Sequence, residues 1–205
     1  MKVFVVDGAI FYANWIRNCE IVTRPDKAQI VFFTGGEDVD SSMYGCIEHP
    51  KTYSNIVRDR KEKEIFDTIN SNQLVIGVCR GSQLMSALNG GLIVQDVHNH
   101  AIWGTHEITN GKDCYQITST HHQMQYPFTI DPKYYDILYW ANGLSDGYYA
   151  GDKIQPELIT EKGEPEIVFY HVPSKPKCLA IQGHPEMMKY GKLHDMLNDL
   201  IEKYV

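Results

Sequence analysis

The segment LVIGVCRGSQLMSALN, residues 74–89, decides how this chain folds. Its first five residues, Leu74 to Val78, form a short apolar run rich in β-branched side chains, which is typical of a buried strand. Residues 82–89 then place three apolar side chains on one face of a helix, and Gly90-Gly91 can close that helix with a positive φ. Cys79-Arg80-Gly81 lies between the two elements. The segment therefore predicts a strand, a sharp turn and a helix of two turns.

The same alternation of elements continues on both sides of this segment. Further strands are expected at Lys2 to Asp7, Gln29 to Thr34 and Cys178 to Gln182, and amphipathic helices at Arg58 to Asn70 and Tyr190 to Tyr204. Strands that alternate with helices indicate a mostly parallel sheet with helical crossovers. Between about 92 and 167 the segments are short and rich in Tyr, Trp, Thr, Gly and Pro, which indicates a short antiparallel excursion. We predict an α/β fold in which residues 1–205 form one domain.

Composition narrows the classes of protein to which this chain can belong. The 205 residues are 43% hydrophobic, enough for a continuous core, and the net charge of −7 argues against a general nucleic-acid binder, which needs a positive surface. No apolar run is long enough to cross a bilayer and no secretory leader opens the chain, so we expect no membrane partner and a cytoplasmic location. The five cysteines are odd in number, widely spaced and without a CxxC pair, which favours a reducing compartment.

The turn at Cys79 has the pattern of a nucleophile elbow. Gly77-Val78-Cys79-Arg80-Gly81 follows a strand and precedes a helix, and its small residues let the two elements approach while the central side chain is lifted above the sheet edge. A thiol at a helix N-terminus is favoured as thiolate by the free N–H groups and the helix dipole. The alternative is that Cys79 is an unreactive cysteine buried as a small hydrophobic side chain. The flanking glycines and polar residues make this alternative less favoured.

A nucleophilic cysteine needs a base and donors for the developing oxyanion. His184 follows the strand at 178–182, and Glu186 is close enough in sequence to hold the imidazole in one tautomer. Taken alone, His-Pro-Glu could equally be a loop turn with a solvated carboxylate. The turn Thr34-Gly35-Gly36-Glu37-Asp38, at the end of another strand, is a natural place for oxyanion donors, although small residues also form ordinary turns.

Four segments together resemble the class I glutamine amidotransferase superfamily. They are residues 35–40 with 44–45, residues 77–83, residues 121–123 and residues 182–186. Within that superfamily the chain is most similar to the branch of γ-glutamyl hydrolases, which includes the enzymes that cleave γ-glutamyl-γ-aminobutyrate. Arg58-Asp59, Gly90-Gly91 with Gln95-Asp96, and residues 145–147 also resemble this branch, so the likeness extends in order over most of the chain.

The resemblance implies a flavodoxin-like three-layer α/β/α fold with its site at the carboxyl ends of the strands. It also implies that Cys79, His184 and Glu186 form a catalytic triad, which attacks a γ-glutamyl amide, forms a thioester and releases glutamate and an amine or ammonia. By the same matching, the backbone N–H groups of Gly36 and Arg80 form the oxyanion hole. The glutamyl amino-acid end is held by Gln83, His121 and His122. We expect no cofactor and no metal.

Three functions remain open at this point. The chain could be a free-standing hydrolase of a small γ-glutamyl conjugate or of glutamine, or a glutaminase subunit that delivers ammonia to a separate synthetase. A catalytically silent homologue that binds a ligand is the less favoured third option, because a silent site has no chemical need for the three triad residues together.

Two further clusters of side chains suggest no function by themselves. His98, His100 and His106 with Glu107 could suggest a zinc site, but their spacing leaves the third ligand unplaced, and we interpret them as ordinary surface histidines. The alternating charges of residues 58–64 are expected to form the solvated face of a helix. The less favoured alternative is that Arg58 and Asp59 fix the region of the elbow.

Overall fold

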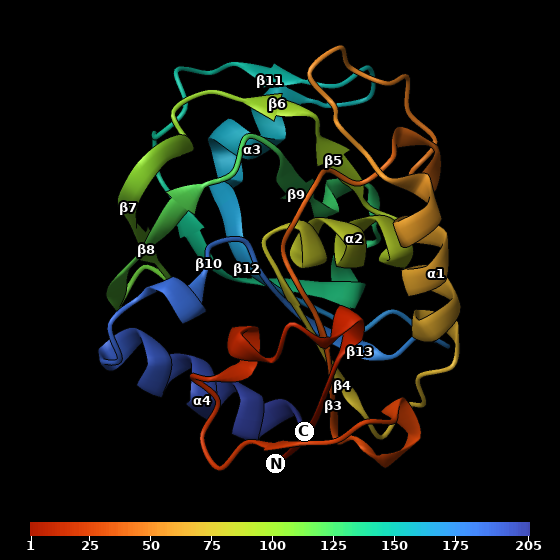
Figure 1. The fold of residues 1–205 in the computed structure, drawn as a ribbon. Helices are drawn as coiled ribbons and strands as arrows, with labels where there is room; N and C mark the ends of the chain where they lie inside the picture. The colour runs from red at the N-terminus through yellow and green to blue at the C-terminus, as the bar shows by residue number, and fades with distance from the viewer.

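The computed structural model describes residues 1–205, which form thirteen strands and four α-helices (Figure 1). The strands are β1 (Lys2–Val5), β2 (Glu20–Ile21), β3 (Ile30–Phe33), β4 (Leu74–Val78), β5 (Leu92–Val94), β6 (Asp96–Val97), β7 (Ala101–Thr109), β8 (Cys114–Thr120), β9 (Met124–Tyr126), β10 (Tyr135–Ala141), β11 (Tyr149–Ala150), β12 (Glu164–Tyr170) and β13 (Lys177–Ile181). The α-helices are α1 (Ile56–Asp67), α2 (Arg80–Asn89), α3 (Pro156–Lys162) and α4 (Lys192–Tyr204).

One nine-stranded sheet runs through the molecule in the order β2-β1-β3-β4-β13-β12-β10-β7-β8. Its first five strands pair in parallel, and β12, β10, β7 and β8 continue it with antiparallel pairing. The α/β fold class is confirmed. The antiparallel excursion proves to be largely an extension of the central sheet, because β13 pairs with β4 on one side and with β12 on the other.

The central strands are buried on both faces, which makes the protein three-layered. Successive side chains of a strand point to opposite faces. Val31, Phe33 and Val75 accordingly pack with residues of α1 and α2, whereas Ile30 and Phe32 belong to a second cluster with residues of α4. Residues of both clusters are almost fully buried, which explains why β3 and β4 have continuous apolar sequences rather than alternating ones.

The strands and helices at the centre of the fold lie where the sequence predicts them. Leu74–Val78 is a strand with the expected bounds, and α2 begins two residues earlier than expected, at Arg80. Gly90, which ends α2, has a φ of 96°, the left-handed conformation predicted for this cap. α1 begins and ends two to three residues before the predicted helix, with the Asn55 side chain accepting a hydrogen bond from the N–H of Arg58.

The ends of the parallel strands determine where the functional groups meet. Phe33 of β3 pairs with Gly77 of β4, and Val78 of β4 pairs with Ile181 of β13. The residues that follow these three strands therefore emerge at the same edge of the sheet, as is usual for sites in open α/β sheets. This edge receives the glycine turn after β3, Cys79 after β4 and His184 after β13.

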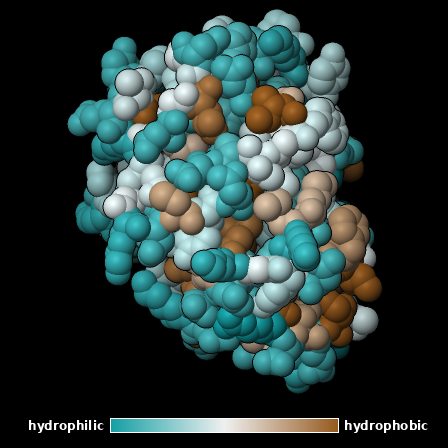
Figure 2. Space-filling view, turned by 90° about the vertical axis from the view of Figure 1, so that its left-hand side faces the viewer, coloured by the Kyte–Doolittle hydropathy of each residue, from teal (hydrophilic) through white to brown (hydrophobic).

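The surface beyond β7 and β8, at the antiparallel end of the sheet, is mainly polar. Figure 2 looks at this side of the molecule and shows hydrophilic residues over most of it, interrupted by smaller hydrophobic patches. β8 is the last strand of the sheet, and a polar surface there limits pairing with other chains. None of the helices combines the length and the apolar character needed to cross a lipid bilayer.

Replacing Gly81 by alanine should strongly destabilise the protein. A Cβ atom at this position would lie 2.4 Å from the carbonyl oxygen of Phe33, so α2 would have to move away from β3. We expect the free energy of unfolding, measured by urea denaturation, to fall by about 2–3 kcal/mol.

Gly104→Ala is the matched control for this prediction. A Cβ atom on Gly104 meets nothing closer than 3.7 Å, and the residue does not have a positive φ. Its substitution should change stability by less than about 0.5 kcal/mol. Equal losses in the two variants would contradict the role given to the contact between Gly81 and β3.

Candidate active site

Cys79 occupies the sharp turn between β4 and α2 in a conformation that few side chains adopt. Its φ is 53° and its ψ is −111°, so the backbone is strained there. Two glycines permit the turn: a Cβ atom on Gly77 would lie 2.4 Å from the carbonyl oxygen of Gly81, and one on Gly81 would collide with β3. The predicted elbow geometry is therefore present. Cys79 is only 8% exposed, so the residue lies recessed in the site rather than at the surface.

His184 follows β13 and is held on two sides. Its backbone N–H donates to Thr118 Oγ1 at 2.7 Å, and its Nδ1 lies 2.6 Å from Glu186 Oε1. Burial favours the neutral ring, but hydrogen bonding and charge from Cys79 and Glu186 outweigh burial and raise the pKa of His184 to about 10. Because Nδ1 is engaged by Glu186, Nε2 is the ring nitrogen left for Cys79. The three residues predicted as a triad thus lie together.

The turn after β3 brings Gly35 and Gly36 against the same histidine. A Cβ atom on Gly35 would lie 2.9 Å from His184 Cε1, so this close approach requires glycine. Gly36 has a φ of 143°, and the hydrogen-bond network contains no partner for its N–H. Arg80 is the first residue of α2, where the helix itself provides no acceptor for a backbone N–H. These are the two donors expected for the oxyanion hole, and that role stays a prediction.

The side chains of α1 fix both turns of the site. Arg58 donates to the carbonyl oxygen of Gly35 at 3.0 Å and to Glu37 at 2.8 Å, which holds the glycine turn. The side chain of Arg80 points away from the site into the protein, where it pairs with Asp59 and Glu62. All three members of this ion cluster are buried.

This ion cluster corrects the interpretation of residues 58–64 as a solvated helix face. Asp59 and Glu62 lie on the inner face of α1 because Arg80, at the start of a buried helix, requires negative partners. The less favoured alternative, in which Arg58 and Asp59 fix the region of the elbow, matches the observed contacts.

Tyr12 also belongs to the site, although nothing in the sequence indicated it. Its ring centroid lies 6.1 Å from that of His184, and its hydroxyl would contact a Cβ atom on Gly35 at 2.8 Å. Burial, together with the charges of Glu186 and Cys79, raises the pKa of Tyr12 to about 12. Tyr12 is part of a short helical turn, Ile10–Ala13, that follows β1, and no motif surrounds it.

The three residues expected to hold a glutamyl group have different environments. Gln83 is buried and donates to the carbonyl oxygen of Gln123 at 2.9 Å, and His121 Nδ1 contacts the same oxygen at 2.8 Å. His122 is partly exposed, with Nε2 at 3.0 Å from Asp38 Oδ1, and hydrogen bonding to Asp38 raises its pKa. Of the three, only His122 lines a cleft of about 670 Å³.

Two of the histidines interpreted as surface residues are buried. His100 and His106 are 0% and 4% exposed and lie beside Glu166, whereas His98 and Glu107 remain at the surface. The burial of these two histidines was not predicted because their partner Glu166 is sixty residues from His106 in the sequence. Only the pairing of strands in the sheet brings Glu166 to the histidines.

Fold and site together define an α/β protein in which a strand–elbow–helix unit presents a cysteine beside a histidine from the neighbouring strand. The family model described as Peptidase C26 matches residues 19–130, more than half of the sequence, and the chain belongs to this family. This places it where the sequence resemblance to the glutamine amidotransferase superfamily indicated.

Two curated relatives match part of this chain. The chain is 26% identical to NtpR of Enterococcus hirae over 152 residues, which are 62% of this chain and 63% of NtpR. It is 36% identical to a glutamine amidotransferase-like protein, a YvdE homolog of Lactococcus lactis subsp. cremoris, over 33% of this chain and 37% of that protein. The alignments thus span less than two thirds of these relatives.

A solved structure shows the same fold at low sequence identity. It is that of a Thermoplasma acidophilum protein described as part of a GMP synthase, with a TM-score of 0.60 and 14% identity. The match covers 98% of this chain and 92% of the other.

Removing one carboxylate from the buried ion cluster should destabilise the protein. In Asp59→Asn, Arg80 loses a negative partner in a place without solvent, and we expect the free energy of unfolding to fall by about 3–5 kcal/mol in urea denaturation. Glu64→Gln, on the exposed face of the same helix, should change it by less than about 0.5 kcal/mol. A loss in Asp59→Asn as small as that in the control would show that the cluster does not anchor α2.

The contribution of His184 to stability should depend on pH. Its pKa is raised from 6.5 to about 10 on folding, so its stabilising contribution is complete below about pH 6.5 and is lost as the pH rises through about 10. The difference in unfolding free energy between the unmodified protein and His184→Gln should therefore shrink over this range. In a Glu186→Gln background the pH dependence should weaken, and a difference that does not vary with pH would contradict the raised pKa.

Proposed function

We propose that this protein hydrolyses a γ-glutamyl amide bond through a thioester on Cys79. The observation that carries the proposal is the strained elbow of Cys79 beside the pair of His184 and Glu186. Strain at a non-glycine residue is maintained where the side chain must be presented in one direction, and nucleophiles are such residues. Membership in the Peptidase C26 family supports the proposal.

In the first half of the reaction the amide is exchanged for a thioester. Because the pKa of His184 is raised to about 10, the proton shared by the cysteine–histidine pair is on His184 before the reaction, and Cys79 Sγ attacks the γ-carbonyl carbon while the N–H groups of Gly36 and Arg80 donate to the oxyanion. The C–N bond then breaks, and His184 gives its proton to the leaving nitrogen. Glu186 stabilises the charged imidazole throughout, because it holds Nδ1 at 2.6 Å.

The second half releases glutamate. A water molecule gives a proton to His184, which is neutral after the first half, and attacks the thioester carbon; the C–S bond then breaks and restores Cys79 beside the charged His184. The ring of Tyr12 packs near His184 in this region.

Recognition of the glutamyl end is proposed to involve the segment 121–123. His122 is charged more readily than an ordinary histidine and lies between two carboxylates, 3.0 Å from Asp38 and 3.7 Å from Asp96. A cation next to anions matches an amino acid, which carries both an α-carboxylate and an α-amino group. Gln83 and His121 would shape this site indirectly, because both contact the carbonyl oxygen of Gln123.

The substrate distinguishes two versions of this activity. A free-standing hydrolase should release glutamate from one or more γ-glutamyl amines without a partner. A glutaminase that serves a separate synthetase should act on glutamine, slowly until the synthetase binds. The fold similarity to a protein described as part of a GMP synthase is the reason to test the glutaminase version as well. Assays of glutamine alone and of a panel of γ-glutamyl amines separate the two.

Cys79→Ala should abolish release of glutamate from every γ-glutamyl substrate that the unmodified protein accepts. No other side chain at the site can form the thioester, so we expect a loss of at least about 10⁴-fold in kcat, measured by coupled glutamate detection. Cys114→Ala is the control, because Cys114 is exposed at the start of β8, and it should keep full activity.

Two results would overturn the proposal. Turnover by Cys79→Ala comparable to that of the control would exclude the thioester. Failure of Cys79 to react with a glutamine-analogue electrophile, with no turnover of any substrate, would favour the catalytically silent homologue that binds a ligand.

A further inference from the structure

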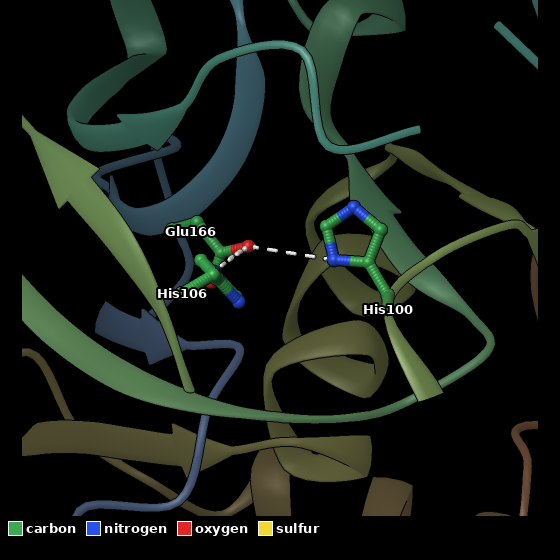
Figure 3. Close-up of side chains that lie close together, drawn as sticks. All are labelled: His100, His106 and Glu166. Atoms are coloured by element: carbon green, nitrogen blue, oxygen red, sulfur yellow. Dashed lines mark ion pairs between the residues drawn. The ribbon is translucent and has the colours of Figure 1, made fainter. Parts of the chain in front are cut away.

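A second cluster of reactive side chains lies inside the antiparallel half of the sheet. His100 immediately precedes β7, His106 lies within β7, and Glu166 belongs to β12. Figure 3 shows the rings of both histidines placed around the carboxylate of Glu166. None of the three is more than 4% exposed, and the proposed reaction does not use them.

The distances within this cluster are those of a metal site. His106 Nε2 lies 3.0 Å and His100 Nδ1 3.9 Å from Glu166 Oε1, and the three ligand atoms all lie within 4.8 Å of one another. A tetrahedral ion with bonds of about 2.0–2.1 Å separates its ligand atoms by roughly 3.4 Å. The two distances to Glu166 Oε1, 3.0 and 3.9 Å, lie on either side of that separation.

Hydrogen bonding alone does not account for these side chains. The ring nitrogens of His100 and His106 and the carboxylate oxygens of Glu166 are buried, and their only polar contacts are the ion pairs with Glu166 and Glu164. A buried polar group left unpaired costs about 1–3 kcal/mol, more when it is charged. The ion pairs leave His106 Nδ1 and Glu166 Oε2 without any partner, and a cation bound by the three side chains would supply the missing interaction.

A second carboxylate orients one of the ligands. Glu164 Oε2 lies 3.4 Å from His100 Nε2, on the side of the ring opposite the proposed metal-binding nitrogen. Glu164 is itself fixed, because its Oε1 accepts from the N–H of Ser145 and from the hydroxyl of Tyr149, both at 3.0 Å. Carboxylate, histidine and metal in this order form the outer arrangement usual for zinc ligands.

A fourth nitrogen is available beside the cluster. The ring centroid of His121 lies 4.7 Å from that of His100, and His121 Nδ1 contacts the carbonyl oxygen of Gln123 at 2.8 Å. That contact makes Nδ1 the donor, so Nε2 carries a lone pair, and Nε2 is buried without a partner.

We propose that His100, His106 and Glu166 bind a divalent transition-metal ion, of which Zn²⁺ is the best match, with His121 or water as a fourth ligand. Imidazole nitrogens with one carboxylate favour zinc and its neighbours, whereas Ca²⁺ and Mg²⁺ prefer oxygen ligands. Such an ion would join β7, β12 and the segment 121–123, and so stabilise the part of the fold that carries His122. The proposal does not rest on the proposed reaction, because its test measures bound metal.

The first measurement uses the unmodified chain. After dialysis against Zn²⁺ and removal of loosely held ions, elemental analysis should find about one zinc per chain, and zinc should raise the melting temperature by several degrees relative to protein treated with EDTA. Replacement of zinc by Co²⁺ should give the visible absorption of a tetrahedral site without a thiolate-to-metal band. This spectrum does not depend on any variant folding correctly.

Variants then assign the ligands. Glu166→Gln and His106→Gln should each lower zinc affinity at least about 10-fold and remove the thermal shift. His171→Gln, a change to a partly exposed histidine outside the cluster, should leave both unchanged. The Cys79→Ser variant should also retain the metal.

Three outcomes would overturn the proposal. Less than about one tenth of an equivalent of zinc with no cobalt spectrum would show that the cluster is an ion-pair network of protonated histidines and carboxylates. A thiolate-to-cobalt band lost in Cys79→Ser would place the metal at the candidate active site instead. Undiminished binding by both cluster variants would place it on surface histidines.

Discussion

The structure depends on the close contact between the start of α2 and the ends of β3 and β4. Gly77 and Gly81 allow backbone to touch backbone there, with no room for a Cβ atom at either residue. That contact turns the chain so sharply that Cys79 takes a positive φ, and it places the thiol where β13 delivers His184. A side chain at either glycine would move the helix, and the turn would open.

A buried ion cluster keeps this contact in place. Arg80 follows Cys79 directly, and its guanidinium is paired with Asp59 and Glu62 of α1, out of reach of solvent. Arg58, from the first turn of the same helix, holds the glycine turn after β3. α1 therefore connects the elbow to the glycine turn after β3. In this way one helix sets the distance between the cysteine and the proposed oxyanion donors.

Much of the parallel half of the fold was predictable because its signals are local. An apolar run such as residues 74–78, a glycine pair or an amphipathic stretch can each be recognised within about ten residues. These signals predicted β4, α2 and the cap at Gly90. The antiparallel half was described only in outline, since its strands are short and their partners distant in sequence. The charged residues of α1 were misassigned for the same reason: nothing near Asp59 in sequence shows that a buried arginine faces it.

The fold class, the elbow at Cys79 and the histidine–glutamate pair that follows β13 could all be predicted from the amino-acid sequence, because each depends on spacing within a short segment. The burial of particular charges, the place of Tyr12 in the site and the meeting of His100, His106 and Glu166 became visible only in the folded chain. These features depend on which strands become neighbours, and strand pairing is set by the packing of the whole sheet rather than by any one stretch of the chain.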